Sequence, residues 1–337
     1  MEPIKIGLIG CGKQAPKHVS GLRKIPGVEV VLADVNPDVA ARLAEQQKLP
    51  WVKSVQDIFA DPSILAVDIC TPTPFHLELI SQAVAGGKDF FCEKPLCDSL
   101  AQAQELAGQV NGLKRRGMIG YVYRFSPIFE LGYNLFADVP RGGDSPVLGR
   151  VVSAFFRIGG RGSHQLWKHR REHGGGAINE MLVHMLDLAL WYFGPVQAAK
   201  ILVCDLLRPR RVIQGQMEEV DAEDYVVVQL QMASGVEVLC QADLLSPAFS
   251  QYVEIQGENG AFMGSIQPDM PSFIFCEKDA AGYPAGKTPL SFGKLNLFEA
   301  QMAEFIRMVR WQQDPARCTL RDSINLLETM EMLQRTR

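Results

Sequence analysis

The sequence has 337 residues, enough for two domains, and its 47% of hydrophobic and 21% of charged residues are ordinary for a soluble globular protein. The net charge of −4 and the pI near 5.9 argue against a general nucleic-acid binder or a protein that binds anionic membranes. No apolar run approaches the roughly 18 residues of a membrane span, the start lacks a secretory signal pattern, and the eight cysteines have neither disulfide-frame nor zinc-site spacing. We therefore expect a cytoplasmic protein with reduced cysteines and no bound metal.

Short apolar segments alternate with segments of helical periodicity in the first part of the chain. The apolar segments suit strands that are buried on both faces of a parallel sheet. They cover residues 4–9, 28–33, 65–70, 89–92 and 118–122, and the segments 37–47, 74–87 and 98–110 between them have helical spacing. This alternation predicts βαβ units and an α/β domain with a doubly wound parallel sheet, which we place at residues 1–123.

A different pattern follows Arg124. Longer apolar segments, joined by turn-like sequences such as ASG and GENG, predict an open and largely antiparallel sheet. The predicted strands cover residues 151–158, 199–207, 224–232, 235–244, 252–257 and 261–266, and the predicted helices cover residues 176–193, 297–312 and 320–334. We therefore expect a second, α+β domain over residues 124–337.

A glycine-rich stretch, GCGKQA, joins the first predicted strand to a helical segment. In this GxGxxA pattern the glycines permit a tight turn and let the backbone approach a pyrophosphate at the positive end of a helix. Asp34 ends the next predicted strand, where a carboxylate binds a ribose diol and disfavours a 2′-phosphate. We expect NAD as the cofactor, with NADP less favoured, although Lys13 weakens that preference; a tight turn without a ligand is the alternative. The cofactor-binding residues predicted here are Gly10, Cys11, Gly12, Lys13, Gln14 and Asp34.

The stretch CTPTPFH, residues 70–76, follows the third predicted strand. Its two prolines fix an irregular loop at the carboxyl edge of the sheet, where ligands bind in such folds. This position predicts cofactor contacts by Thr71, Pro72 and His76. Since His76 opens the following helix, simple capping of that helix is the favoured alternative for this residue.

The stretch FFCEKPL places a Glu-Lys pair just after the fourth predicted strand, and Pro95 prevents the strand from continuing. An ammonium group held at that edge can hydrogen-bond a substrate hydroxyl or carbonyl oxygen and stabilise developing negative charge. Lys94 is therefore a candidate catalytic residue. Taken alone, Glu93 and Lys94 would be interpreted as a surface ion pair of little consequence.

The segment GGGAINEMLVHMLDLALWYFG is apolar on nearly all sides when wound as a helix, so we expect it to be buried. From Glu180 to its end, its only ionisable residues are Glu180, His184 and Asp187, and at about 100° per residue they fall within one stripe roughly 60° wide. Such groups require partners or a polar cleft. We predict that His184 transfers protons near neutral pH. A structural hydrogen bond in the core is the alternative, and we favour it for Asp187.

Four stretches, in this order, closely resemble the Gfo/Idh/MocA family, named after glucose–fructose oxidoreductase and inositol dehydrogenase. They are GLIGCGKQAPKH, CTPTPFHLELISQAVAGGKDFFCEKPL, YVYRF and the glycine-rich helix, and the similarity spans essentially the whole chain. The resemblance implies a Rossmann domain followed by an α+β domain whose open sheet often forms homodimers or homotetramers. It also implies hydride transfer between NAD(P) and a hydroxyl or carbonyl group of a sugar, polyol or sugar derivative.

The resemblance also implies roles for single residues. Lys94 matches the lysine that contacts the reacting oxygen, and His184 matches the histidine that exchanges the proton. Glu180 stands where the family usually has Asp, so the backbone recedes or the longer side chain reaches a different substrate atom. The implied catalytic residues are Lys94, His184 and Glu180; the implied cofactor contacts include Glu93, Lys94, Arg124 and Trp167; and the implied substrate contacts are Lys94, Tyr123, Arg170, Glu180 and His184.

A basic segment between Arg157 and His173 precedes the glycine-rich helix. It could recognise a phosphate, carboxylate or diphosphate group on a sugar, with Arg170 as one contact. A solvated or subunit-contacting loop is the favoured alternative.

Two other functions remain open beside a sugar or polyol dehydrogenase. One is NAD-assisted glycoside cleavage, in which transient oxidation labilises a sugar bond without net accumulation of NADH. The other is a non-catalytic dinucleotide-binding regulator. The presence of both Lys94 and His184 favours an enzyme over a regulator.

Overall fold

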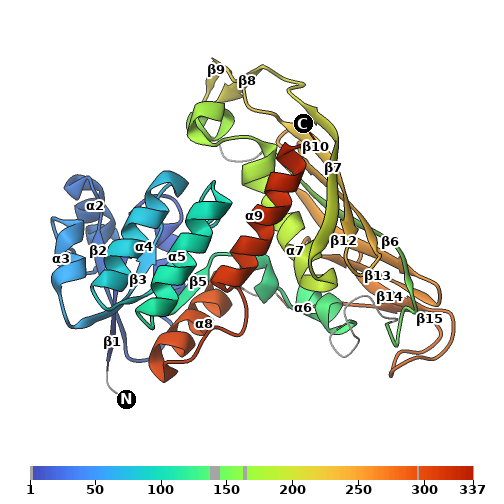
Figure 1. Ribbon diagram of the computed structural model, residues 1–337, viewed down its shortest axis with the longest axis horizontal. Coiled ribbons are helices and arrows are strands. Elements are labelled where there is room, and N and C mark those ends of the chain that lie inside the picture. The colour runs from blue at the N-terminus through green and yellow to red at the C-terminus, as the bar shows by residue number, and fades with distance from the viewer. Residues whose placement is uncertain (1–2, 137–144, 162–164, 294–295, 337) are drawn as a thin grey trace. The chain divides into compact units, whose positions relative to one another are not determined.

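The computed structural model describes residues 3–136, 145–161, 165–293 and 296–336 (Figure 1). The chain divides into two compact units. Unit 1 comprises Met1–Phe125 and Asn296–Leu327, and unit 2 comprises Ser126–Leu295 and Glu328–Arg337. In the described part of the chain, no helix has the length and apolar character that crossing a membrane requires.

Unit 1 contains a parallel sheet with the strand order β2-β1-β3-β4-β5, built from five strands among the described residues. The strands are β1 (Ile4–Ile9), β2 (Val28–Ala33), β3 (Ile64–Ile69), β4 (Asp89–Cys92) and β5 (Gly117–Ile119). Every neighbouring pair is parallel. Apart from Leu65, which is exposed near the start of β3, most of their apolar side chains are buried on both faces of the sheet, as parallel strands covered by helices require. The predicted doubly wound α/β architecture is confirmed.

The helices of unit 1 follow the predicted alternation. They are α1 (Ala15–Leu22), α2 (Pro37–Gln47), α3 (Val55–Ala60), α4 (His76–Ala85), α5 (Leu100–Gly112) and α8 (Leu297–Trp311), with short 3₁₀ turns η1 (Thr73–Phe75) and η2 (Val122–Phe125). Four begin at side-chain caps: Asn36 for α2, Ser54 for α3, Ser99 for α5 and Asn296 for α8. Each cap accepts a hydrogen bond from a backbone N–H in the first turn, which satisfies a donor that the helix leaves without a partner.

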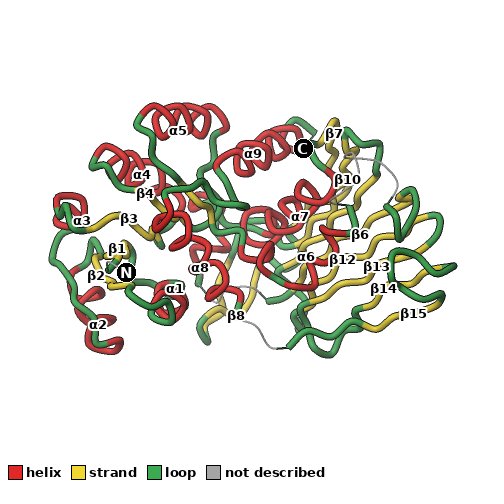
Figure 2. Tube along the Cα trace, turned by 90° about the horizontal axis from the view of Figure 1, so that it is seen from below, coloured by secondary structure: helices red, strands yellow, loops and turns green. Residues whose placement is uncertain are grey.

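The C-terminal part of the chain returns to unit 1, which differs from the domain boundary predicted after residue 123. Helix α8 packs against α1 (Figure 2). The approach is close at Gly21, because a Cβ there would lie 2.9 Å from Met302 Cγ and from Phe298 O. Met302 and Phe305 of α8 are fully buried. Helix α8 therefore buries its apolar face in unit 1, whereas the prediction from the sequence assigned it to the second domain.

The described residues of unit 2 form an eight-stranded sheet with the order β15-β14-β13-β12-β6-β11-β10-β7. These strands are β6 (Val151–Gly159), β7 (Val196–Asp205), β10 (Tyr225–Met232), β11 (Glu237–Asp243), β12 (Ser250–Gly257), β13 (Gly260–Ser265), β14 (Phe273–Cys276) and β15 (Gly286–Pro289). All neighbouring pairs are antiparallel except β6 with β11. The predicted open, mostly antiparallel sheet is thus confirmed. A separate hairpin, β8 (Arg210–Ile213) and β9 (Gln216–Glu219), was not predicted.

Helices cover part of this sheet in unit 2. Helix α7 (Val183–Phe193) packs against β6 and β11, and α6 (Pro127–Asn134) packs against β13. Helix α9 (Leu320–Gln334) runs across the division of the chain. The regular helix predicted over residues 176–193 is wrong in its first part, since Ile178–Leu182 form a π-helical turn. A π turn changes the angle between successive side chains. The single stripe predicted for Glu180, His184 and Asp187 from regular α-helical geometry is therefore wrong at Glu180.

Candidate functional site

The glycine-rich turn lies between β1 and α1 in unit 1. Gly10 has a φ of +94°, and a Cβ there would lie 2.9 Å from the backbone of Cys70, so glycine is required. Among the described residues, apart from the two chain neighbours of Gly12, no atom lies within 4 Å of a Cβ built on Gly12, which leaves space above the turn. The Cys11 N–H donates to Asp34 Oδ2 at 2.7 Å, and the Asn36 N–H donates to Asp34 Oδ1 at 2.9 Å. Asp34 is therefore fixed beside the turn.

Two buried oxygen atoms near this turn indicate a ligand. Among the described residues, Gln14 Oε1 and Thr71 Oγ1 have no hydrogen-bond partner. Buried polar atoms without partners are rare in folded proteins and call for an unseen water or ligand. Gln14 precedes α1, and Thr71 follows β3, at the carboxyl edge of the parallel sheet. Together with the open space at Gly12, they fit a dinucleotide bound at this edge.

His76 connects two loops at the same edge and does not cap its own helix. Its ring is buried, with Nδ1 2.9 Å from Pro95 O and Nε2 2.9 Å from Thr71 O. Burial lowers the pKa of His76 below its ordinary value, although the two carbonyl groups oppose this shift. Capping of the following helix, the alternative favoured for His76, is therefore wrong. Cofactor contact by His76, and by Pro72 before η1, stays a prediction.

The Glu-Lys pair follows β4 and is not a surface ion pair. Glu93 is only 8% exposed, and its Oε2 accepts a hydrogen bond from the backbone N–H of Lys94 at 3.1 Å. The Lys94–Pro95 peptide bond is cis. Glu93 Oε1 lies 3.0 Å from Nε2 of His18, a residue that sequence analysis missed.

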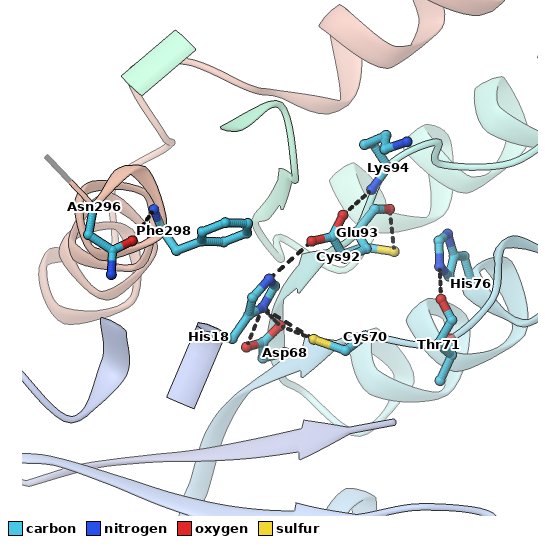
Figure 3. Close-up of polar contacts among 10 residues, drawn as sticks. All are labelled: His18, Asp68, Cys70, Thr71, His76, Cys92, Glu93, Lys94, Asn296 and Phe298. Atoms are coloured by element: carbon cyan, nitrogen blue, oxygen red, sulfur yellow. Dashed lines mark hydrogen bonds and ion pairs between the residues drawn. The ribbon is translucent and has the colours of Figure 1, made fainter. Parts of the chain in front are cut away.

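His18 of α1 lies at the centre of a buried polar cluster (Figure 3). Its Nδ1 is 3.0 Å from both carboxylate oxygens of Asp68 and 3.2 Å from Cys70 Sγ. His18 and Asp68 are fully buried. Both ring nitrogens of His18 face a carboxylate, which requires a donor on each nitrogen and hence an imidazolium ion. One signal of this cluster was present in the sequence: Asp68 is the only charged residue of the apolar strand β3.

The electrostatics agree with this assignment. Burial alone would lower the pKa of His18, but Asp68 and Cys70 raise it well above its ordinary value. Burial alone would raise the pKa of Glu93, but His18 and Lys94 lower it. The donor atoms of His18, Asp68 and Cys70 also lie close enough to hold a metal ion. Since the imidazole already bridges two carboxylates, the cluster is explained as an ion-pair network that holds the backbone of Lys94.

The segment after β5 carries two further predicted residues. Arg124 is buried, and its Nη1 lies 3.0 Å from Asp322 Oδ1. The backbone oxygen of Arg124 accepts a hydrogen bond from Arg317 Nη1 at 2.7 Å. Burial raises the pKa of Tyr123 above its ordinary value, so its phenol is protonated at neutral pH. Asp322 and Arg317 come from the C-terminal segment of unit 1 and were not predicted as part of this region.

In unit 2, the π-helical turn holds Glu180 against Lys168. Lys168 Nζ lies 2.5 Å from Glu180 Oε2, and both side chains are largely buried. Lys168 belongs to a short 3₁₀ turn, η3 (Leu166–His169), and its Nζ lies 5.1 Å from the ring centroid of Trp167. In the sequence, Lys168 was recognisable only as part of the basic segment between Arg157 and His173. The structure thus brings Trp167, Lys168 and Glu180 together.

The remaining predicted residues of unit 2 lie nearby in the chain. His184 is half-buried on α7, and Asp187 is only 2% exposed. Arg170 is half-buried, and its backbone N–H donates to Trp167 O at 3.2 Å. The predicted cooperation of Lys94 with His184 joins residues of both units and stays a prediction.

Comparison with known proteins identifies both parts of the chain. Residues 4–121 match the model of an oxidoreductase family with an NAD-binding Rossmann fold, GFO_IDH_MocA, and residues 144–263 match the GFO/IDH/MocA C-terminal domain. Levoglucosan dehydrogenase of Pseudarthrobacter phenanthrenivorans is 25% identical over 298 residues, covering 78% of this chain and 74% of the relative. Inositol 2-dehydrogenase of Rhizobium meliloti is 27% identical over 268 residues, covering 78% of this chain and 76% of the relative.

Solved structures share the fold over the full length. A levoglucosan dehydrogenase in complex with NADH and L-sorbose has a TM-score of 0.87 and 20% identity, covering 100% of this chain and 97% of the other. GenD2 from gentamicin A biosynthesis, in complex with NAD, has a TM-score of 0.82 and 22% identity, covering 100% and 94%. With the Rossmann sheet, the glycine-rich turn and the second-domain sheet in place, the chain belongs to the GFO/IDH/MocA family of NAD-binding oxidoreductases.

Proposed function

We propose that the protein is an NAD-dependent dehydrogenase of a sugar, a polyol or a related compound. The observation that carries this proposal is Lys94, whose backbone is held by Glu93 at the edge of the sheet that also bears the dinucleotide turn. Relatives named levoglucosan dehydrogenase and inositol 2-dehydrogenase support the substrate class.

The proposed reaction oxidises a secondary hydroxyl group to a carbonyl group. Bound NAD supplies the hydride acceptor at its nicotinamide ring. The ammonium group of Lys94 donates a hydrogen bond to the substrate oxygen and stabilises negative charge that develops on it. The imidazole of His184 accepts the hydroxyl proton, so that the carbon loses a hydride and the oxygen loses a proton. Reduction of the carbonyl group runs through the same steps in reverse.

Glu180 has a proposed role in orienting the substrate. The ion pair with Lys168 limits the movement of its carboxylate, which orients that group for a hydrogen bond from a substrate hydroxyl group. This pair offers a use for the additional methylene group of Glu180, because the longer side chain reaches Lys168.

Absorbance at 340 nm tests the proposal. The protein is mixed with NAD⁺ or NADP⁺ and with levoglucosan, inositols, and neutral and acidic sugars. We expect NADH formation with at least one substrate, and a loss of at least 100-fold in kcat for Lys94→Ala, checked by fluorescence to bind NADH normally. Sugar release without net NADH would favour glycoside cleavage instead, and NADH binding with no reaction would favour a regulator.

We also propose that the protein is a cytoplasmic homo-oligomer that assembles through the sheet of unit 2. Exposed apolar side chains on this sheet support assembly, since Leu239 of β11 and Phe275 of β14 are 40% and 42% exposed. Light scattering coupled to gel filtration tests the assembly. A monomer at micromolar concentration would contradict it.

A further inference from the structure

A basic pocket lies within unit 2, beside the β8–β9 hairpin. Its volume is about 730 Å³, which is in the range of small-molecule sites. Four arginines line it, together with His169 and several apolar side chains; the arginines are Arg161, Arg208, Arg210 and Arg211. This concentration of positive charge stands out in a chain with a net charge of −4.

A buried carboxylate holds one wall of the pocket in place. Asp224 is fully buried and accepts hydrogen bonds from the backbone N–H groups of Leu207 and Arg208, at 2.8 and 2.9 Å. It also pairs with Arg211 at 2.5 Å. Arg211 in turn donates to the backbone oxygen of Arg208 and contacts Nδ1 of His169 at 3.4 Å. The turn before β8 and the guanidinium group of Arg211 are thus positioned before any ligand arrives.

The positive charge of the pocket is only partly balanced. Asp224 neutralises Arg211, and Arg210 lies 3.8 Å from Glu219 in a solvent-exposed pair that contributes little. Within the described ranges, no carboxylate lies within ion-pair distance of Arg161 or Arg208. Burial lowers the pKa of Arg211, and although Asp224 opposes this shift, the charge of Arg208 adds to it. An anion in the pocket would relieve this repulsion.

The backbone connects the pocket to the candidate substrate residues, although those residues do not line it. His169 follows Lys168, which pairs with Glu180. The backbone oxygen of His169 accepts hydrogen bonds from the N–H groups of residues 221 and 222, at 3.4 and 3.3 Å. The next residue, Glu223, accepts a hydrogen bond at its backbone oxygen from the Ala177 N–H at 2.8 Å, just before the π-helical turn. One short segment thus connects the pocket to the turn that carries Glu180.

We propose that this pocket binds an oxyanion, a phosphate or carboxylate group, that the substrate carries. The inference rests on the proposed function and narrows the substrate to an anionic sugar or polyol. Guanidinium groups bind both kinds of oxyanion through paired hydrogen bonds. The basic segment considered in the sequence contributes Arg161 and His169 to this pocket, whereas Arg170 and Arg171 are not among its lining residues. A free anion that acts as an effector would make the same contacts as an oxyanion carried by the substrate. The test must therefore distinguish a free anion from a substrate-borne one.

Isothermal titration calorimetry on the full-length protein tests the proposal, with inorganic phosphate, D-glucose and D-glucose 6-phosphate as probes. The test variant carries Arg161→Gln and Arg208→Gln. The matched control is Arg150→Gln, which removes a 71% exposed arginine of unit 2 that pairs with Glu258 and does not line the pocket. Circular dichroism confirms that both variants are folded. We expect the wild type and the control to bind glucose 6-phosphate more tightly than glucose, and the double variant to lose at least tenfold in this affinity.

The proposal would be overturned if the double variant bound inorganic phosphate and glucose 6-phosphate as tightly as the wild type binds them. If only inorganic phosphate binding is lost, while kcat/KM for an identified substrate is unchanged, the anion is an effector and the substrate assignment is wrong. Failure of the pocket proposal can be distinguished from failure of the proposed function. If NADH forms from a neutral polyol and no anion binds, only the proposal that the pocket binds an oxyanion is refuted. If anions bind in a manner that depends on the arginines but no NADH forms with any substrate, only the proposal that the protein is a dehydrogenase is refuted.

Discussion

At the residue scale, the buried imidazolium ion is the main electrostatic feature of unit 1. His18 faces Asp68 of β3, Cys70 just after it, and Glu93 after β4, while the rings of Phe91 and Phe298 lie at centroid distances of 5.3 and 5.7 Å. Removing one member of a buried ion pair leaves the other charge without compensation. The cluster therefore couples the stability of the unit to pH.

We expect Asp68→Asn to lower the free energy of unfolding by about 3 kcal/mol near pH 6. The folded pKa of His18 is raised, so its stabilising effect is fully present below its ordinary pKa of 6.5 and is lost as the pH rises through the folded value. Glu93 has a lowered pKa, so its contribution is present above 4.5 and is lost as the pH falls through its folded value.

Urea unfolding between pH 5.5 and 9 measures this effect. The wild type is expected to lose stability with rising pH more steeply than Asp68→Asn. Prior dialysis against EDTA is the control for metal binding by His18, Asp68 and Cys70, and it should leave both curves unchanged. Parallel curves for the two proteins would contradict the imidazolium assignment.

Asp34 carries the second prediction at this scale. Its carboxylate is fixed by two backbone N–H groups at the end of β2, where it would repel a 2′-phosphate. We expect Asp34→Ser to lower kcat/KM for NAD⁺ at least tenfold. The ratio of kcat/KM for NADP⁺ to kcat/KM for NAD⁺ should rise. Steady-state kinetics with both cofactors measures this ratio. An unchanged ratio would show that Asp34 does not select the cofactor.

At the scale of elements, the sequence was most informative where residue type and strand position coincide. Asp34 and Glu93 follow apolar strands, so both could be assigned to the carboxyl edge of the sheet. The partners His18 and Lys168 could not be predicted, because pairing across separate elements leaves no local pattern. The β8–β9 hairpin is polar and short, so its segments lack the apolar alternation by which strands are recognised.

Packing of α8 on α1 gives a prediction with an internal control. Gly21→Ala would place a Cβ 2.9 Å from Phe298 O and Met302 Cγ, so we expect a loss of about 1–3 kcal/mol in the free energy of unfolding. The Cβ of Gly108→Ala in α5 meets no atom of the described residues within 4 Å outside its own helix, so this substitution should stabilise the protein by up to about 1 kcal/mol. Thermal unfolding of both variants measures the difference. Equal shifts would mean that α8 does not pack tightly at Gly21.

At the scale of the whole molecule, unit 1 is built from two segments that lie far apart in the sequence. The Ile119 N–H donates to Cys318 O at 2.8 Å, Tyr121 and Ser323 share a hydrogen bond of 2.8 Å, and Phe91 contacts Phe305. These contacts join β4, β5 and the segment after β5 to residues 296–327. A fragment that ends at the predicted boundary therefore lacks part of its own core.

We expect a fragment of residues 1–125 to fold poorly, with broad amide resonances and exposed apolar surface. The same fragment joined by a flexible linker to residues 296–327 should give dispersed resonances and bind NADH. Proton–nitrogen correlation spectra of the two fragments make the comparison. A well-dispersed spectrum from the shorter fragment would show that α8 is dispensable for folding.

The return of α8 also has a consequence for synthesis on the ribosome. About 170 residues of unit 2 are translated between the two parts of unit 1. At a translation rate of roughly 5–20 residues per second, α8 is synthesised on the order of ten to thirty seconds after the Rossmann sheet that it covers. During that interval the apolar surface that α8 will cover is accessible to chaperones, so this part of the chain is where we expect a newly made molecule to be recognised.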